Sequence, residues 1–366
     1  MIIYLLTLGI TFLLAYFAQG KQRVLEDGVI KKTTKNGKWA IAAVCAILIF
    51  VAGARYATGT DYWDYLGWFG YYRERPLWEV LQREEGFFWG ISTILGYFTK
   101  DPNIAFFVCE AIIIFCFVPT FVKYSHNLSL TVFLYLAMFD YFSTFNGVRQ
   151  WTAAAITFAS LPLLKERKLF RYLLMILFAY CFHNSAIFMI PIGLFALVSP
   201  TSKWNIGILG IIGILFFLFP TTLDSILEEV VKDSYTQFIG MEGDDGVHIL
   251  RVLVALLPPL VARIFYKQLA TQEKDRKFLD LLINFSTVNF VIMLLATRST
   301  TMARVGMYVS PYNALLIPYF LRIFKKESRL TAKFVIMALF LVYMMMLLPT
   351  DSNLLPYRNI YGWYFA

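Results

Sequence analysis

The chain has 366 residues, of which 59% are hydrophobic and only 16% are charged. Its mean hydropathy of +0.62 excludes a water-soluble fold of this length, because the surface would have to be one large apolar patch. The composition therefore predicts an all-α, polytopic integral membrane protein. The formal net charge of +9 is typical of basic cytoplasmic loops beside anionic headgroups, so membrane lipids are expected partners and nucleic acid is not.

A transmembrane helix needs about 20 apolar residues. The first apolar segment has no basic region before it, so it is expected to be a span and not a cleaved signal peptide. A shorter stretch near 86–98 is better explained as a re-entrant or interfacial helix. The sequence predicts twelve spans, near residues 2–18, 39–56, 104–122, 128–144, 147–164, 169–183, 185–198, 205–220, 249–266, 279–296, 305–321 and 331–348.

The positive-inside rule decides the orientation of these helices. If the segment 86–98 does not cross the bilayer and the N-terminus is outside, most of the 33 Lys and Arg residues fall in inner loops. If it crossed, the later basic loops would lie on the opposite side from Lys21–Lys38. We therefore expect one transmembrane domain, 1–366, with both termini outside. Two long outer loops, 57–103 and 221–248, place the chemically varied residues on the outer face.

The stretch Phe145–Ala155 places Asn, Arg and Gln where an apolar helix should begin. Asn146 is a good N-cap residue for a helix expected to end at Leu164. The backbone N–H groups of the first turn and the Arg149 guanidinium would then converge, as they do in phosphate-binding sites. Gln150 adds a second polar group. The alternative is that Arg149 reaches lipid headgroups and that Asn146 only caps the helix.

A second outer cluster, Arg55–Tyr65, mixes aromatic rings with an arginine and two aspartates. Such mixtures suit sugars, because a ring such as Tyr62 stacks on the apolar face of a pyranose while a carboxylate such as Asp61 accepts a hydroxyl proton. The alternative is an interfacial aromatic girdle with solvated charges. Glu85 opens the short interfacial helix, where an acidic residue is favourable even without a catalytic role.

Two further groups lie at predicted outer helix ends. His183 is in a tight turn between two helices, where it could transfer a proton or donate to a phosphate; the alternative is a hydrogen-bonded structural role. Arg298 and Arg304 flank a run of hydroxyl residues, and Tyr308 follows Arg304 by four residues on the same predicted helix face. With Arg149 they would bind a multiply charged anion such as pyrophosphate, unless they pair with the acidic second outer loop.

Metal and cofactor chemistry has no support in the sequence. All four cysteines lie inside apolar segments and form no CxxC pair, so neither disulfides nor a zinc site is predicted. No Gly-rich phosphate loop, HExxH motif or nucleophile elbow occurs. We therefore expect no metal and no cofactor.

Four motifs resemble the pattern of the EpsG family, which comprises Wzy-like bacterial polysaccharide polymerases. The resemblance covers most of the chain and is more specific in the first half than around Arg304 and Pro356-Tyr357-Arg358. The motifs are Arg55-Tyr-Ala-Thr-Gly-Thr-Asp61-Tyr, Glu85-Gly-Phe, Phe145-Asn-Gly-Val-Arg149-Gln150 and Phe182-His183-Asn-Ser185-Ala.

The resemblance implies a GT-C-like membrane glycosyltransferase at the outer, periplasmic face of a bacterial inner membrane. It would move a growing glycan from undecaprenyl pyrophosphate to the sugar end of a lipid-linked repeat unit, for O-antigen, exopolysaccharide or capsule. Chain-length regulator and flippase proteins are implied partners. Asp61 is the preferred base, His183 the second, and Glu85 a further catalytic candidate. The expected substrate-binding residues are Arg55, Tyr62, Asn146, Arg149, Gln150, Arg298, Arg304 and Tyr308.

Three other functions stay open from the sequence. A ligase that moves a finished glycan onto another acceptor would need the same pyrophosphate site. A transporter or flippase would need a polar path through the bilayer, but deep intramembrane charge is almost limited to Glu110. A purely structural partner of a polysaccharide complex would tolerate loss of the Arg and His residues. The gathering of polar groups on one face favours chemistry at a surface.

Overall fold

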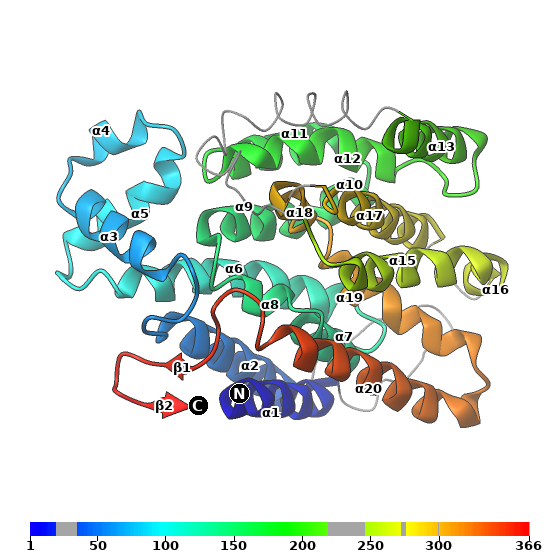
Figure 1. The fold of residues 1–366 in the computed structure, drawn as a ribbon, viewed down its shortest axis with the longest axis horizontal. Helices are drawn as coiled ribbons and strands as arrows, with labels where there is room; N and C mark the ends of the chain where they lie inside the picture. Colours follow the sequence, from blue (N-terminus) through cyan, green and yellow to red (C-terminus); the bar gives the residue numbers. More distant parts are fainter. Residues whose placement is uncertain (20–34, 219–245, 272–275, 299, 366) are drawn as a thin grey trace. The chain divides into compact units, whose positions relative to one another are not determined.

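The computed structural model describes residues 1–366 apart from 20–34, 219–245, 272–275, 299 and 366. The described residues are mostly helical, and their strands are limited to two of two residues each, which confirms the predicted all-α class (Figure 1). The outer loop predicted at 221–248 lies almost wholly outside the described residues. The chain divides into two units: unit 1 is Met1–Leu161, Leu174–Ala186 and Phe324–Ala366, and unit 2 is Pro162–Leu173 and Ile187–Ile323.

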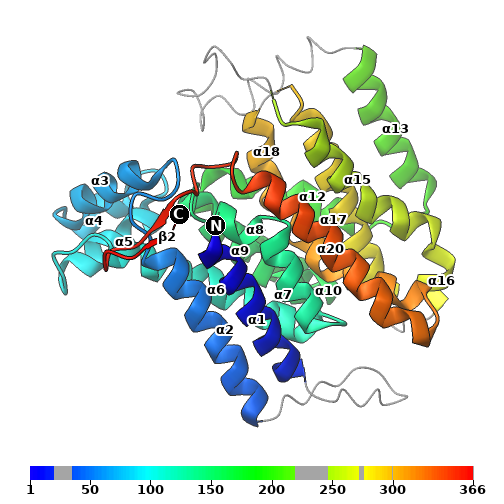
Figure 2. The ribbon, with the colours of Figure 1, turned by 60° about the horizontal axis from the view of Figure 1, so that its bottom comes forward.

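Unit 1 contains a body of long apolar helices and a smaller helical group. In the body α1 packs on α2 and α7, and α6 packs on α2 and α9. Figure 2 shows α1 and α2 side by side. In the smaller group α5 packs on α3 and α4. The elements are α1 (Ile2–Gln19), α2 (Lys35–Gly53), α3 (Tyr62–Arg73), α4 (Leu77–Leu81), α5 (Gly86–Gly96), α6 (Ile104–Tyr124), α7 (Leu128–Ala137), α8 (Asp140–Ser143), α9 (Val148–Ala159), η3 (Lys326–Ser328), α20 (Arg329–Leu347), β1 (Tyr357–Arg358) and β2 (Tyr364–Phe365).

Aromatic side chains fill the core between α6, α7 and α9. The ring of Phe117 lies 4.9 Å from that of Phe158 and 5.2 Å from that of Tyr135. Phe121 contacts the same two rings, at 5.4 Å and 5.3 Å. Each such pair adds about 0.5–1.5 kcal/mol to the stabilisation from area burial. This packing fixes α9, whose first turn carries Arg149.

Helix α17 is the centre of unit 2, where it packs on α12, α15, α18 and α19. Its buried Asn284 donates to the carbonyl of Ala196 (3.1 Å) and accepts from the Asn205 amide (2.9 Å), so this polar group is satisfied within the helix bundle. The elements of unit 2 are α12 (Met189–Ala196), α13 (Lys203–Leu218), α15 (Ile249–Ile264), α16 (Tyr266–Thr271), α17 (Arg276–Leu295), α18 (Thr300–Gly306), α19 (Tyr312–Leu316) and η2 (Ile317–Ile323). Three further helices contain residues of both units, namely α10 (Leu161–Lys165), α11 (Leu169–Tyr180) and η1 (Asn184–Phe188).

Four helical segments among the described residues are long and apolar enough to cross a bilayer, namely α1, α6, α17 and Lys326–Leu347, which includes α20. The predicted count of twelve spans is therefore not confirmed. Shorter apolar helices account for much of the difference, and they are Gly37–Gly53, Gly86–Gly96, Leu128–Ala137, Leu169–Tyr180 and Asn184–Ala196.

Two predicted spans are each split into two helices, and each break has a local cause. The segment 128–144 forms α7 and α8, because Phe139 between them adopts a left-handed conformation with φ 76°. The segment 147–164 forms α9 and α10. Pro162 lacks a backbone N–H and disfavours helical geometry in the residue before it, so the helix stops shortly before it.

A third predicted span, 305–321, is also interrupted. It is divided among the end of α18, α19 and η2, and it contains Pro311 and Pro318, which remove two backbone donors. The apolar segment predicted at 86–98 does form a short helix, α5, of 11 residues. At about 1.5 Å per residue this helix is too short to cross a bilayer.

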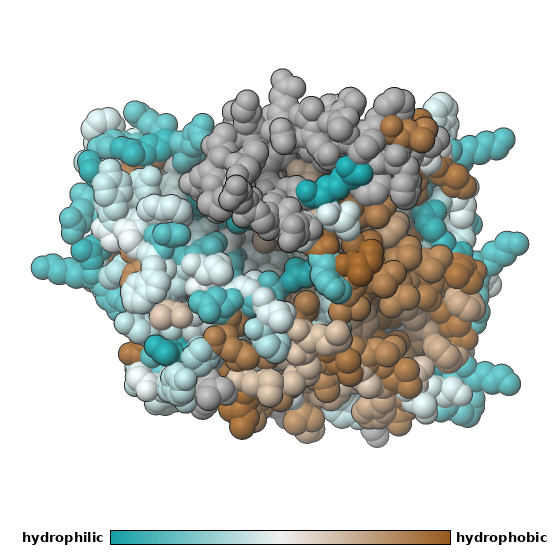
Figure 3. Space-filling view, viewed as in Figure 1, coloured by the Kyte–Doolittle hydropathy of each residue, from teal (hydrophilic) through white to brown (hydrophobic). Residues whose placement is uncertain are grey.

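Apolar side chains are exposed along several helices. In Figure 3, hydrophobic residues gather over α15 and α20, whereas the surface over α3, α4 and α5 is mostly hydrophilic or neutral. A water-soluble protein rarely exposes such apolar stripes, but a helix that faces lipid does. The exposed apolar residues are Ile249, Leu253, Leu257, Leu260 and Ile264 on α15, and Leu330, Phe334, Val335, Leu339, Val342 and Met346 on α20.

The segment after α20 forms a strand pair, β1–β2, that the sequence did not predict. It is anchored to the end of α2, where the Tyr357 hydroxyl donates to the Val51 carbonyl (2.8 Å) and the Ile360 N–H donates to the Ala54 carbonyl (2.9 Å). The C-terminal segment therefore covers the start of the loop that follows Arg55.

Candidate functional site

The first turn of α9 begins one residue later than predicted. Gly147 precedes the helix with φ 58°, a left-handed conformation that glycine adopts without steric cost, and Val148 is the first helical residue. Asn146 is therefore not the N-cap, which corrects the sequence-based assignment. Its Oδ1 accepts hydrogen bonds from the Thr60 hydroxyl (3.0 Å) and the Asp61 N–H (3.2 Å), so it holds the loop before α3.

Asp61, and not Asn146, supplies a side-chain acceptor at the start of α9. Its Oδ2 accepts a hydrogen bond from the Gly147 N–H at 2.9 Å, and its Oδ1 accepts one from the Thr60 hydroxyl at 3.0 Å. A carboxylate in this position stabilises the positive end of α9. Both carboxylate oxygens of Asp61 are thus engaged in holding two segments together.

Arg149 lies in the first turn of α9 and is enclosed by aromatic rings. Its guanidinium carbon lies 5.3 Å from the ring centre of Trp68 and 5.1 Å from that of Trp89, and cation–π attraction holds it between them. Its backbone N–H donates to the Tyr65 hydroxyl at 3.2 Å. About a quarter of the side chain remains accessible (26%), so the guanidinium can also reach a ligand.

Glu85 is the acidic partner of Arg149. Its Oε2 accepts from Arg149 Nη1 at 2.6 Å, and its Oε1 accepts from the Asn184 N–H at 3.3 Å. The side chain is only 9% exposed. Burial raises the pKa of the Glu85 carboxyl above its ordinary value, and the neighbouring Arg149 only partly offsets this. A carboxylate with a raised pKa is better suited to accept a proton near neutral pH.

His183 and Gln150 extend this cluster. His183 Nδ1 lies 3.7 Å from Glu85 Oε1 and 2.9 Å from the Ser185 hydroxyl oxygen. Gln150 is buried and donates from Nε2 to the same Ser185 oxygen at 3.1 Å. The structure thus brings Glu85, Arg149, Gln150 and His183 into one connected polar cluster, which we call the Arg149 cluster together with Ser185.

Two predicted substrate-binding residues are buried instead. Arg55 is 1% exposed, donates to the Ala52 carbonyl and to the Phe145 carbonyl (3.3 Å), and lies over the Phe106 ring at 4.3 Å. Tyr62 is fully buried and is stacked on the same Phe106 ring. Both side chains hold the loop before α3 against α6 and have no accessible surface for a ligand.

The remaining predicted residues belong to unit 2. Arg298 is exposed and Arg304 half-buried, whereas Tyr308 is buried. Helix α18 ends at Gly306, so Arg304 and Tyr308 do not share one helix face, which corrects that expectation. A part for these residues in the site stays a prediction.

Sequence reasoning missed several residues that shape the cluster. Trp68, Trp89 and Tyr65 surround Arg149, and Ser185 links Gln150 to His183. Tyr65 is the last residue of the Arg55–Tyr65 cluster, for which sugar binding and an interfacial girdle both stayed open, and Trp68 lies beyond it. Their spacing gave a signal, because Tyr65 and Trp68 are three residues apart and therefore lie on one helix face.

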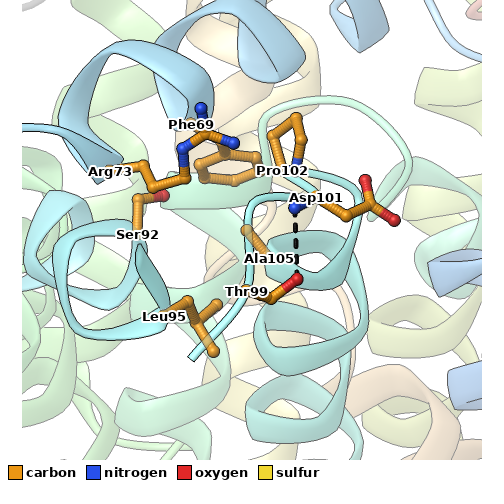
Figure 4. Close-up of a pocket in the computed structure, with 8 residues that line it drawn as sticks. All are labelled: Phe69, Arg73, Ser92, Leu95, Thr99, Asp101, Pro102 and Ala105. Atoms are coloured by element: carbon orange, nitrogen blue, oxygen red, sulfur yellow. Dashed lines mark hydrogen bonds between the residues drawn. The ribbon is translucent and has the colours of Figure 1, made fainter. Parts of the chain in front are cut away.

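A small pocket lies between α3, α5 and the start of α6, and none of the residues that line it belongs to the Arg149 cluster (Figure 4). The Asp101 N–H donates to the Thr99 hydroxyl across its edge at 3.1 Å. Among the described residues, no group of three or more His, Cys, Asp or Glu side chains could hold a metal ion. The pocket is lined by Phe69, Arg73, Ser92, Leu95, Thr99, Asp101, Pro102 and Ala105.

Comparison with known proteins identifies the family. No curated protein and no solved structure matches the chain. The profile of the EpsG family matches residues 38–359, which include every residue of the Arg149 cluster. Together with the long apolar helices, this match indicates a multi-pass membrane protein with a polysaccharide polymerase-type function. The chain belongs to the EpsG family, the family of Wzy-like polysaccharide polymerases.

Proposed function

We propose that the protein is a membrane glycosyltransferase of GT-C-like type that polymerises undecaprenyl-pyrophosphate-linked oligosaccharide repeat units at the outer face of the bacterial inner membrane. The observation that carries the proposal is the Glu85–Arg149 pair at 2.6 Å with His183 beside it. It puts a fixed cation, a buried carboxylate and an imidazole within one cluster. Pyrophosphate departure needs a cation, and activation of an acceptor hydroxyl needs a base.

The reaction is a displacement at the anomeric carbon of the donor sugar. The acceptor hydroxyl oxygen bonds to that carbon, and the bond between the carbon and the pyrophosphate oxygen breaks with its electron pair moving to the oxygen. The hydroxyl proton passes to a carboxylate. Arg149 stabilises the departing pyrophosphate, and its aromatic neighbours Trp68 and Trp89 hold the guanidinium in place before the substrate arrives.

Geometry favours Glu85 over Asp61 as the base. Asp61 accepts from the Gly147 backbone N–H and the Thr60 hydroxyl at the start of α9, whereas the oxygens of Glu85 accept from Arg149 and from the Asn184 N–H. Glu85 is buried with a raised pKa and lies beside the arginine that would hold the leaving group. We therefore assign the base to Glu85 and keep Asp61 as the competing candidate, and the variant Asp61→Asn separates the two.

The test is a polymerisation assay with purified protein in nanodiscs and lipid-linked repeat units, in which chain length is followed by gel electrophoresis. We expect ladders from the natural protein and at least about 100-fold less product from Arg149→Ala. The matched control is Arg83→Ala, which breaks a surface Arg–Glu pair of 2.9 Å and should leave the ladder unchanged.

The same assay separates the alternatives. Full ladders from Arg149→Ala would remove this residue from the mechanism. A single transfer onto a non-glycan acceptor, without ladders, would identify a ligase. Movement of the lipid-linked unit between leaflets without any new glycosidic bond would identify a flippase.

A further inference from the structure

Two polar side chains beside His183 restrict which of its ring nitrogens carries the proton. The Ser185 backbone N–H donates to His183 Nδ1 at 3.2 Å, and the Ser185 hydroxyl oxygen lies 2.9 Å from the same nitrogen. Gln150 Nε2 donates to that hydroxyl oxygen at 3.1 Å. His183, Ser185 and Gln150 are 6%, 2% and 2% exposed, so bulk water does not compete for these bonds.

The donor and the acceptor in each of these hydrogen bonds can be assigned, because the backbone N–H and the amide nitrogen can only donate. A backbone N–H can only donate, so His183 Nδ1 must accept. The amide nitrogen of Gln150 can only donate, so the Ser185 oxygen accepts from it and retains its own proton for donation towards Nδ1. A neutral imidazole that accepts at Nδ1 carries its proton at Nε2.

We propose that Gln150 and Ser185 are positioning residues that hold neutral His183 as the Nε2–H tautomer. His183 is then a hydrogen-bond donor and not a base, because its protonated Nε2 cannot take a proton from the acceptor hydroxyl. This replaces the expectation that Gln150 binds substrate directly. The charged group that faces Nδ1 is Glu85, at 3.7 Å, whose other oxygen is paired with Arg149.

The tautomer gives His183 and Glu85 different tasks, and this step rests on the proposed function. An Nε2–H group can donate to a phosphate oxygen and stabilise the negative charge that grows there as the pyrophosphate leaves. Glu85 remains to accept the hydroxyl proton. Arg149 and His183 would thus both act on the leaving group, one through charge and the other through a directed hydrogen bond.

The first test reads the tautomer directly and does not depend on activity. Protein labelled with ¹⁵N-histidine is studied by NMR in nanodiscs, and the resonances that disappear in His183→Gln identify His183. We expect the neutral ring to be protonated at Nε2 in the natural protein. In Gln150→Leu the Ser185 hydroxyl loses the donor that orients it, while the Ser185 backbone N–H still donates to Nδ1, so Nε2–H should remain the main form and a minor population protonated at Nδ1 should appear.

The matched control is Thr152→Val on the same helix. Thr152 is also buried, and its hydroxyl donates only to the Val148 carbonyl of its own helix at 2.8 Å, so the tautomer should not change. A natural His183 protonated at Nδ1 would overturn the inference. A population protonated at Nδ1 that is no larger in Gln150→Leu than in the natural protein would overturn the part assigned to Gln150.

The second test uses kinetics. We expect Gln150→Leu and Ser185→Ala to lower kcat by about 10- to 100-fold with little change in KM, because the donor is misdirected while binding groups remain. Ser185→Thr keeps a hydroxyl and should recover most of the rate. An equal loss in Ser185→Ala and Ser185→Thr would contradict positioning through the hydroxyl. Absence of polymerisation by the natural protein, with the Nε2–H tautomer present, would refute the proposed function alone.

Discussion

Asp61 Oδ2 accepts a hydrogen bond from the backbone N–H of Gly147, 86 residues later in the chain. This bond joins the loop before α3 to the start of α9. It fixes the backbone at Gly147, two residues before Arg149. The carboxylate that the sequence favoured as a base is therefore engaged as a cap.

The Asp61 bond gives a test of the two possible roles of this carboxylate. Asp61→Asn keeps an oxygen that can accept from Gly147, so we expect most of the polymerase activity to remain. Asp61→Ala removes the cap and should cost about 1 kcal/mol of stability, with reduced activity. Thermal unfolding and ladder assays on both variants provide the measurement. An Asp61→Asn protein that is stable but inactive would instead make Asp61 the base.

The loop before α3 also has no room for a side chain at Gly59. Its φ is +100°, and an added Cβ would lie 2.8 Å from Asn146 Oδ1 and 3.0 Å from the Phe145 carbonyl oxygen. We expect Gly59→Ala to destabilise the protein by about 1–3 kcal/mol and to lower activity. The control is Gly67→Ala on α3, where no atom lies within 4 Å of the added Cβ.

Gly67→Ala should keep full activity and raise stability by about 0.5–1 kcal/mol, because alanine favours a helix over glycine. Both unfolding temperatures are measured in the same detergent. Equal behaviour of the two variants would show that the left-handed turn at Gly59 does not constrain the site.

Glu85 should give the stability of the protein a specific pH dependence. Its raised carboxyl pKa means that the folded state holds this proton more tightly than the unfolded chain does. The contribution of this proton to the free energy of unfolding is fully present below the ordinary Glu pKa of about 4.3, and it is lost as the pH rises through the raised pKa. Glu85→Gln cannot ionise, so the natural protein should lose stability relative to this variant over that interval.

The measurement is the difference in unfolding temperature between Glu85→Gln and the natural protein, scanned across pH. Because Glu85→Gln also loses its ion pair with Arg149, the difference in unfolding temperature is shifted by a constant amount. The sign of its slope against pH still shows whether the Glu85 pKa is raised. Glu79→Gln, in a surface pair with Arg83, is the matched control for the loss of an ion pair with an arginine. A Glu85 slope of opposite sign would mean that ion pairing outweighs burial.

Sequence reasoning found most members of the Arg149 cluster but not their partners. A polar residue at the edge of an apolar run is visible by itself, which is how Arg149, Gln150 and His183 were recognised. Glu85 lies 64 residues before Arg149, and no local pattern records that pairing. The start of α9 was misassigned for the same reason: Asn146 and Asp61 both carry a side-chain acceptor, and it is the distant one that accepts from the Gly147 N–H, while Gly147 itself is the N-cap.

The helical class was predictable because composition and hydropathy determine it. The helix lengths were not, because a break such as the left-handed Phe139 occurs in an apolar run that contains no Gly or Pro to signal it. The strand pair after α20 was also unforeseen, since each strand has only two residues.

The carbonyls of Ser352 and Asn353 accept hydrogen bonds from the Asn146 amide (3.1 Å) and the Gly59 N–H (3.0 Å). Two of the contacts that shape the loop beside Arg149 thus come from residues made only after α20. During synthesis the earlier helices can insert and pack while this loop still lacks those contacts. The loop beside Arg149 would then be completed late, only when the last segment has docked.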